Sequence, residues 1–390
     1  MSSTAISGMA GKGLRIYSRE AVLFGCMVLL VLFVIITAAI NRMYHKKIHV
    51  LADNWFAQGE ASFQAGDIQS ALIDYRNALV YSPGNAKFQF HLAQALAVTG
   101  RGDEGRTYLL NLLSESPGKG DVNLALARIA ARKGATSEAI RYYHAGIYGE
   151  WENDPIAMRW QVRRELSEYL LDHGEVQQAV PEIIALADNT PPDDLERRKV
   201  VGNLLLRAKL WARALDIFRS LVSMSDQDHD ALLGAAMSAF ELGRYDLALD
   251  YFDRLPQQER EAPDVVGLYQ AAQQIDAMNP FVAGLSHEAK ARRAADALPY
   301  ARKRLQDCAG QEGQSLVAPP QTPLQKAFAD SKELEARGTL QYIGKHPETI
   351  EDVMAHVFQM ENAAADACGT PQDADRALWL LGRSRGVPVQ

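Results

Sequence analysis

The sequence predicts an all-α chain in which one membrane-spanning helix precedes a stack of antiparallel helix pairs. Three observations predict this fold class. An apolar run without a charged residue lies near the N-terminus, small residues recur after it with a period of 34 residues, and glycine and proline stand where helices should end. Hydrophobic residues make up 47% of the chain and charged residues 23%, a composition typical of folded proteins.

The apolar run extends from Ala21 to Ile40. At 1.5 Å per residue, a helix of this length reaches about 30 Å, the thickness of the hydrocarbon core of a bilayer. A cleaved signal peptide has a shorter apolar core, so the length favours an uncleaved membrane anchor over residues 21–41. Cleavage remains an alternative, because Thr37-Ala38-Ala39 would serve as a cleavage site.

The charges that flank this run do not decide its orientation, because three lysines or arginines stand on each side. A short tail with three cations is hard to translocate, whereas a long domain crosses a membrane largely regardless of its charge. We therefore predict a cytoplasmic tail over residues 1–20 and a single-pass protein whose body is exported. In a bacterium the body would lie in the periplasm.

After the anchor, small, aromatic and proline residues recur with a constant step. Gly66, Gly100 and Gly134 are 34 residues apart. The pattern resembles the tetratricopeptide repeat (TPR), with about six copies over residues 52–260. The residues that match the family's structural positions are Trp55, Gly59, Ala71, Tyr75, Ala78, Pro83, Gly100, Pro117, Gly134, Ala139, Tyr143, Ala214, Phe218, Gly243, Ala248 and Phe252.

The resemblance implies that each copy is a pair of antiparallel helices and that the copies stack into an α-solenoid. Small residues let the helices approach closely, a glycine in the left-handed conformation ends the first helix, and a proline ends the second. No pair can bury its apolar face alone, so the stack is the folding unit. An insertion of about six residues near Trp151 interrupts the period before the fourth pair.

By resemblance, the first helix of each pair lines a concave face where protein partners bind. The residues at these positions combine an aromatic end with a basic end, which would suit an extended or helical peptide carrying acidic residues. Lys199 and Asn203 match the first pair of the carboxylate clamp of chaperone-binding TPRs, but Gly234 stands where that clamp needs asparagine. Each candidate could instead be a solvated surface side chain. The candidates are Phe56, Glu60, Phe63, Phe90, Gln94, Arg128, Arg132, Lys199, Asn203 and Arg207.

Beyond the repeats we expect capping helices over residues 261–309, a linker rich in turn-forming residues over 310–323, and a C-terminal helical segment over 324–390. Cys308 and Cys368 are the two cysteines outside the apolar run. They would pair in an oxidising compartment and stay reduced in the cytosol, and the sequence leaves both possibilities open. A disulfide between them would hold the C-terminal segment against the end of the repeats.

No catalytic motif is present in the sequence: there is no P-loop, GxSxG elbow, HExxH, CxxC or glycine-rich dinucleotide turn. We therefore expect no enzymatic activity, no cofactor and no metal site. The net charge of −7 provides no broad basic field, so nucleic acid is not an expected partner.

Together these observations predict a membrane-anchored TPR scaffold or adaptor that mediates protein–protein interactions in the bacterial cell envelope, in assembly, secretion or export machinery. An alternative is a chaperone-like factor for unfolded exported proteins. A less favoured alternative is an enzyme whose activity lies in residues 324–390. The identity of the partner and the oligomeric state do not follow from the sequence.

Overall fold

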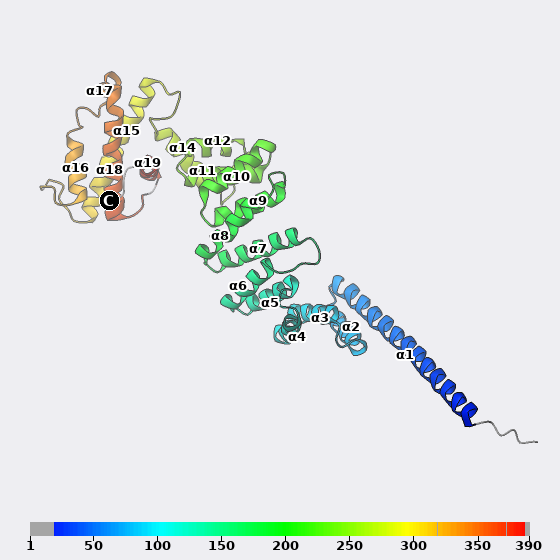
Figure 1. Ribbon diagram of the computed structural model, residues 1–390. Helices are drawn as coiled ribbons and strands as arrows, with labels where there is room; N and C mark the ends of the chain where they lie inside the picture. The colour runs from blue at the N-terminus through cyan, green and yellow to red at the C-terminus, as the bar shows by residue number, and fades with distance from the viewer. Residues whose placement is uncertain (1–18, 318, 372, 387–390) are drawn as a thin grey trace, which may run out of the picture. The chain divides into compact units, whose positions relative to one another are not determined.

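The computed structural model describes residues 19–317, 319–371 and 373–386, and its regular elements are all helices, which confirms the predicted fold class (Figure 1). The predicted cytoplasmic tail lies almost entirely outside the described residues. The chain divides into two compact units, residues 1–162 and 163–390.

The first unit begins with α1 (Arg19–Gln64), which serves two purposes in one unbroken helix. Its N-terminal half is the predicted span, and its C-terminal part, from about Ala52 onward, is the first helix of the first repeat. We expected a separate span and repeat helix. They are continuous because residues 42–58 contain neither glycine nor proline, so nothing in the backbone breaks the helix between them.

Three antiparallel helix pairs follow one another in the first unit. The two helices of each pair pack together, and the second helix of one pair packs on the first helix of the next, which is the contact pattern of a repeat stack. After α1, the helices are α2 (Ile68–Tyr81), α3 (Ala86–Val98), α4 (Gly102–Glu115), α5 (Gly120–Arg132) and α6 (Thr136–Ile147).

The glycines of the period end the first helix of their pairs. Gly66, Gly100 and Gly134 have φ of +81°, +80° and +72°, in the left-handed region that glycine adopts without steric cost. In the fifth pair Lys209 takes this position with φ of +58°. The conformation is therefore required by the turn, and it persists where the sequence lacks the glycine.

The small and aromatic positions of the repeat fit against one another. A Cβ added at Gly59 would lie 2.7 Å from the ring of Tyr75, which is fully buried. In the second unit, Cβ atoms added at Gly202 and Gly234 would lie 2.6 and 2.5 Å from the ring of Phe218. Because these glycines have no side chain, an aromatic ring can fill the space between the helices.

The second unit continues the helix pairs. It receives the C-terminal part of α7 (Pro155–Asp172), whose N-terminal part belongs to the first unit. The helices that follow are α8 (Val176–Asp188), α9 (Leu195–Arg207), α10 (Trp211–Met224), α11 (His229–Glu241), α12 (Tyr245–Arg254), the short α13 (Gln257–Arg260) and α14 (Val266–Met278).

The last five α-helices of the second unit form a bundle around α15 (His287–Gln311) (Figure 1). We expected α15 to be a capping helix, separated by a linker from the C-terminal segment. Instead α15 packs against α16, α17, α18 and α19, because alanines, Leu298 and Leu305 give it a buried face along its length. The other helices are α16 (Pro323–Lys332), α17 (Leu340–Lys345), α18 (Ile350–Cys368) and α19 (Asp373–Ser384).

Two further differences concern the C-terminal segment. The beginning of this segment is not one continuous helix, because a turn at residues 333–339 separates α16 from α17, and a Cβ added at Gly338 in this turn would lie 2.4 Å from Leu298. The C-terminal helix α19 packs against α14 as well as α18, and the hydroxyl of Tyr245 in α12 donates to the carbonyl of Leu380 at 3.4 Å. The segment thus closes the end of the second unit's repeats.

A disulfide joins the two helices that contact each other most extensively in the bundle. Cys308 lies near the end of α15 and Cys368 is the last residue of α18, with their Cα atoms 5.9 Å apart. The two cysteines are 60 residues apart in the sequence, so the bond closes a long loop and holds the C-terminal ends of α15 and α18 together.

Candidate protein-binding surface

Phe56, the first aromatic groove candidate, lies inside the first repeat. Its ring stacks on Phe88 with centroids 4.8 Å apart and meets the ring of His91 edge-on at 5.0 Å. Only 8% of the residue is exposed, and Lys87 covers its ring with the ammonium 4.6 Å from the centroid. Phe56 therefore joins the first two repeats together and presents little surface to a partner.

Glu60, the second candidate, is held by two donors from neighbouring helices. The hydroxyl of Tyr75 donates to its Oε1 at 2.5 Å, and Nδ1 of His91 lies 2.6 Å from the same oxygen. Burial lowers the pKa of His91, and the nearby Glu60 only partly offsets this. The imidazole, the phenol and the carboxylate thus contact one another and form a closed network.

The remaining candidates of the first unit differ in exposure. Phe63 is half-buried and packs on the core of the first repeat, whereas Phe90 and Gln94 lie half-exposed on α3. Arg128 is half-buried, and Arg132 is exposed with its Nε donating to the Arg128 carbonyl at 3.3 Å. Of these candidates, Arg132 is the exposed one, and the others are intermediate in burial.

In the second unit, the basic candidates already have acidic partners. The ammonium of Lys199 lies 2.8 Å from the carboxylate of Asp228, and this hydrogen bond raises the pKa of Lys199. Arg207 pairs with Asp172 at 2.5 Å. Asn203, which lies between Lys199 and Arg207 in the sequence, is exposed. At Gly234 the ring of Phe218 leaves no room for a side chain. A carboxylate clamp of the chaperone-binding type is therefore not assembled here.

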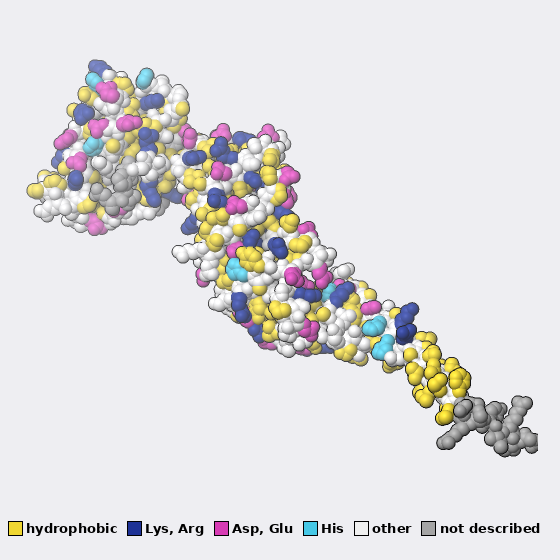
Figure 2. All heavy atoms as spheres, in the orientation of Figure 1, with side chains coloured by type: hydrophobic (Ala, Val, Ile, Leu, Met, Phe, Trp, Pro, Cys, Tyr) yellow, Lys and Arg dark blue, Asp and Glu magenta, His cyan; other side chains and the backbone are white. Residues whose placement is uncertain are grey.

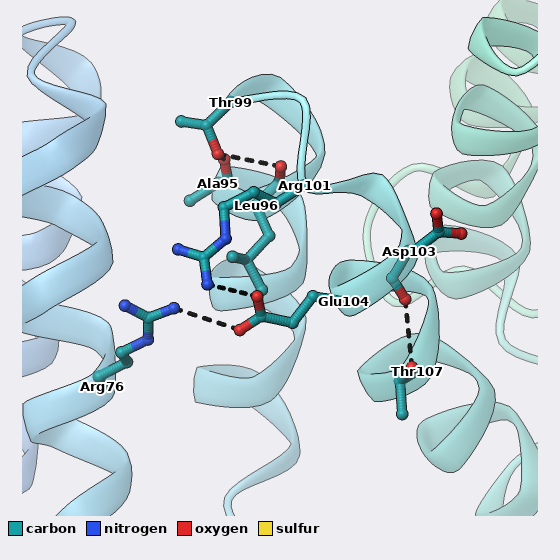
Figure 3. Close-up of polar contacts among 8 residues, drawn as sticks. All are labelled: Arg76, Ala95, Leu96, Thr99, Arg101, Asp103, Glu104 and Thr107. Atoms are coloured by element: carbon teal, nitrogen blue, oxygen red, sulfur yellow. Dashed lines mark hydrogen bonds and ion pairs between the residues drawn. The ribbon is translucent and has the colours of Figure 1, made fainter.

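The second helices of the pairs carry ion pairs that join successive repeats (Figure 3). Arg76 of α2 reaches Glu104 of α4 at 3.2 Å, and Arg101 contacts the other oxygen of the same carboxylate. One repeat further along, Arg106 of α4 pairs with Glu138 of α6 at 2.5 Å. These pairs are partly exposed, so they help to set the register between repeats and add little stability.

Sequence reasoning missed one hollow of the first unit. It lies beside the insertion at residues 148–154, and its signal in the sequence was the interruption of the 34-residue period at Trp151. Within the described residues, no group of three or more His, Cys, Asp or Glu side chains is arranged to hold a metal ion.

Comparisons with known proteins agree with the repeat assignment. A family model described as tetratricopeptide repeat matches residues 56–120, 164–229 and 201–264. No curated protein matches the sequence. The chain therefore carries tetratricopeptide repeats in both of its compact units, which confirms the resemblance seen in the sequence.

Several solved structures show similarity to this chain. The Pseudomonas aeruginosa pilF protein is 16% identical, with a TM-score of 0.42, over 58% of this chain and 98% of that one. PilW, a type IV pilus biogenesis factor, is 15% identical with a TM-score of 0.41, over 56% and 97% of the two chains. The C-terminal part of a TPR protein from Cytophaga hutchinsonii is 12% identical with a TM-score of 0.42, over 83% and 99%.

Proposed function

We propose that this chain is a membrane-anchored TPR scaffold that binds other proteins close to a membrane surface in the bacterial cell envelope and does no chemistry of its own. One observation carries the proposal: α1 is at once an exposed apolar helix long enough to cross a bilayer and the first helix of the repeat stack. A binding module is thereby joined to the membrane by a rigid element.

The exposed part of α1 supports the anchor. Its large apolar side chains from Leu23 to Ile40 are 40–68% exposed, an arrangement that is costly in water and favourable in lipid. Figure 2 shows this apolar surface, followed by the basic and histidine side chains between His45 and His49. About 18 Å of helix separates Ile40 from Ala52, so the first repeat would begin about 18 Å from the end of the membrane span.

The disulfide supports an exported body. Disulfides persist in the periplasm and other oxidising compartments and are rare in the cytosol, and Cys308 and Cys368 are bonded in the C-terminal bundle. The orientation with a cytoplasmic N-terminus is consistent with this placement.

Labelling of cysteines on intact cells tests the orientation. A membrane-impermeant maleimide should label Cys308 and Cys368 only after a reductant is added, because the bond must open first. If both label without reductant and only after lysis, the body is cytoplasmic and the envelope role is wrong. Resistance of the protein to extraction from membranes by alkaline carbonate checks the anchor in the same preparation.

Photo-crosslinking in native membranes tests the binding function. A photoreactive residue placed at Gln94 on α3 or Asn203 on α9 should give one or two discrete adducts. The same residue at Ile73, which is 59% exposed on the second helix of the first pair, should give none. Equal adducts at all three positions would contradict a specific binding surface. A broad range of adduct masses at Gln94 and Asn203 would support the chaperone-like alternative instead.

A further inference from the structure

The insertion between α6 and α7 is a built turn with a defined shape. The amide of Gly120 donates to the carbonyl of Glu150 at 2.9 Å, and the amide of Glu150 donates to the carbonyl of Gly118 at 2.7 Å. These two bonds form a short parallel bridge that ties the insertion to the turn before α5. Asp154 then accepts from the amide of Ala157 at 3.1 Å and begins α7.

Trp151 is locked onto this bridge. Its indole Nε1 donates to the carbonyl of Gly146 at 2.9 Å, and its ring covers Gly120 so closely that a Cβ there would lie 2.4 Å away. A Cβ at Gly149 would meet the Cα of Gly120 at 2.7 Å. Two glycines therefore allow the backbone segments to approach, and the indole is held without depending on a ligand.

Beside this indole lies a pocket of about 420 Å³, a size that accommodates a large side chain together with adjoining backbone. Trp151 and the thioether of Met158 supply its apolar surface. The charged side chains are three carboxylates and one ammonium. The residues that line the pocket include Lys119, Asp121, Glu150, Trp151, Glu152 and Met158.

The charges of the pocket favour a cation. The ammonium of Lys119 lies 3.5 Å from Glu152, so one carboxylate is already neutralised. Glu150 forms no ion pair within the described residues, and one Asp121 oxygen accepts from the amide of Val122 at 2.8 Å. In the part of the chain that the structure describes, Asp121 and Glu150 thus have no ion-pair partner, and they lie beside an aromatic face. This is the combination that binds a guanidinium by stacking and by bidentate hydrogen bonds.

The surface around the pocket indicates a macromolecular source for that cation. Tyr148, the first residue of the insertion, and Ile156, in the first turn of α7, flank the lining residues of the insertion in the sequence and are 74% and 77% exposed. A small amine would leave both side chains in water, whereas a protein segment would cover them. We propose that this pocket binds an arginine side chain of a partner protein, with the apolar neighbours of that arginine resting on Tyr148 and Ile156.

This site is separate from the first-helix positions of the proposed scaffold surface, although a protein partner is common to both. The pocket lies between the insertion and the first turns of α5 and α7, and neither Gln94 nor Asn203 lines it. Loss of peptide binding at the pocket would leave crosslinking at those positions intact, and failure of crosslinking would leave peptide binding at the pocket measurable.

The test uses the full-length protein in detergent micelles and three fluorescently labelled pentapeptides, Ac-Ala-Leu-X-Leu-Ala-NH2, in which X is arginine, lysine or citrulline. Fluorescence anisotropy should rank arginine first and citrulline at least tenfold weaker, because citrulline keeps the shape and lacks the charge. Binding of the arginine peptide should weaken on raising the salt concentration. The proposal would be overturned if the citrulline and arginine peptides bound within twofold of each other. It would also be overturned if the arginine peptide showed no binding at about 5 mM, an order-of-magnitude limit for weak peptide recognition.

Variants assign the binding to the pocket. Glu150→Gln should weaken the arginine peptide at least threefold and leave the fold intact, because its backbone and not its carboxylate forms the bridge. Trp151→Ala should weaken it at least tenfold, with circular dichroism checking that the unit stays folded. Glu115→Gln, an exposed glutamate at the end of α4, is the matched control and should change binding less than twofold.

The last arm distinguishes a protein segment from a small guanidinium ligand. N-acetylarginine amide should bind at least tenfold more weakly than the arginine pentapeptide, since it cannot reach Tyr148 and Ile156. Equal affinities would mean that the pocket takes a small cation, and an undiminished affinity of the Glu150→Gln variant would place the peptide elsewhere. Either result would overturn the proposal.

Discussion

The three repeats of α1–α6 and the bundle of α15–α19 are stabilised by different kinds of contact. In the repeats, each helix packs mainly against its neighbours in the sequence, and glycines such as Gly59 meet aromatic rings such as Tyr75 at the period of the repeat. In the bundle, α15 packs on α18 across some forty intervening residues of chain, and the bond between Cys308 and Cys368 joins them. Contacts between helices adjacent in the sequence stabilise the first region, and contacts between helices distant in the chain stabilise the second.

The same contrast holds for charged groups. The ion pair of Arg76 and Glu104 between repeats is about 40% exposed on both sides. In the bundle, Arg304 of α15 lies 3.3 Å from Glu361 of α18, whose side chain is wholly buried and whose oxygens receive no hydrogen bond among the described residues. Burial, with a contribution from Asp375, raises the pKa of Glu361 to about 8, and Arg304 only partly opposes this. The bundle thus contains a carboxyl group whose ionisation destabilises it, and its long-range contacts must offset this cost as the pH rises.

Removing the disulfide should give the largest effect and should separate the two regions. Cys308→Ser and Cys368→Ser should each destabilise the bundle by about 4 kcal/mol, because the loop that the bond closes regains its freedom in the unfolded chain. Hydrogen exchange measured by mass spectrometry should show faster exchange in α15–α19 and unchanged exchange in α1–α6. Cys26→Ser is the control, and equal protection of the bundle in all three variants would contradict the prediction.

Glu361→Gln should stabilise the bundle at high pH by a few kcal/mol. The carboxyl of the unfolded chain releases its proton near pH 4.5 and that of the folded chain near pH 8, so the wild-type protein loses stability as the pH rises through this window. The amide cannot ionise, so the variant should lack this decline. Melting temperatures measured from pH 5 to 9 check it, with the exposed Glu351→Gln on the same helix as control. An unchanged pH slope in Glu361→Gln would show that Glu361 is not the group responsible.

A glycine of the repeat pattern should be intolerant of a methyl group. Gly202→Ala should destabilise the second unit by about 1–3 kcal/mol, because the new Cβ would lie 2.6 Å from the ring of Phe218. Gly267→Ala in α14 is the matched control, since no atom lies within 4 Å of its Cβ position, and it should be neutral or stabilising by up to about 1 kcal/mol. Urea unfolding compares the two. If both variants behave alike, the repeat does not depend on the close packing described here.

The surface ion pairs of the repeats should matter least. Arg76→Ala should cost less than about 1 kcal/mol, because the Arg76–Glu104 pair is partly solvated and Arg101 continues to contact Glu104. The small loss should shrink further in 1 M salt, which screens exposed charges. Thermal unfolding at two salt concentrations measures both effects. A loss above about 2 kcal/mol that salt does not reduce would place this pair among the structural contacts of the stack.

Periodicity explains why the repeat region was predictable and the bundle was not. Gly66, Gly100 and Gly134 each stand at the end of a first helix. The rule that a glycine ends such a helix therefore predicted all three of these turns correctly. The position of Lys209 shows the limit of that rule, because the turn keeps its left-handed backbone without the glycine. The bundle has no period, so the possible pairing of Cys308 with Cys368, which the sequence left open, was the one indication that α15 would meet α18.

The candidate groove residues differ in accessibility, which their position in the repeat does not determine. Phe90, Gln94 and Asn203 are at least partly exposed, as a groove position requires, whereas Phe56 is buried by a ring from the next repeat. Whether an aromatic at such a position faces a partner or a neighbouring repeat depends on the side chains that lie across from it, and the sequence of one copy does not contain that information.

By itself, the sequence determined the apolar helix, the helix pairs with their turns, and the pairs of small and aromatic residues that let them stack, because each depends on residues within one or two turns of chain or one repeat length. The tertiary structure alone decided that α1 continues from span to repeat core, that α19 returns to α14, that Lys199 and Arg207 are occupied by internal carboxylates, and that the insertion at Trp151 makes a pocket. These depend on contacts between residues distant in the chain, whose free energy is settled by burial and shape after the helices have formed.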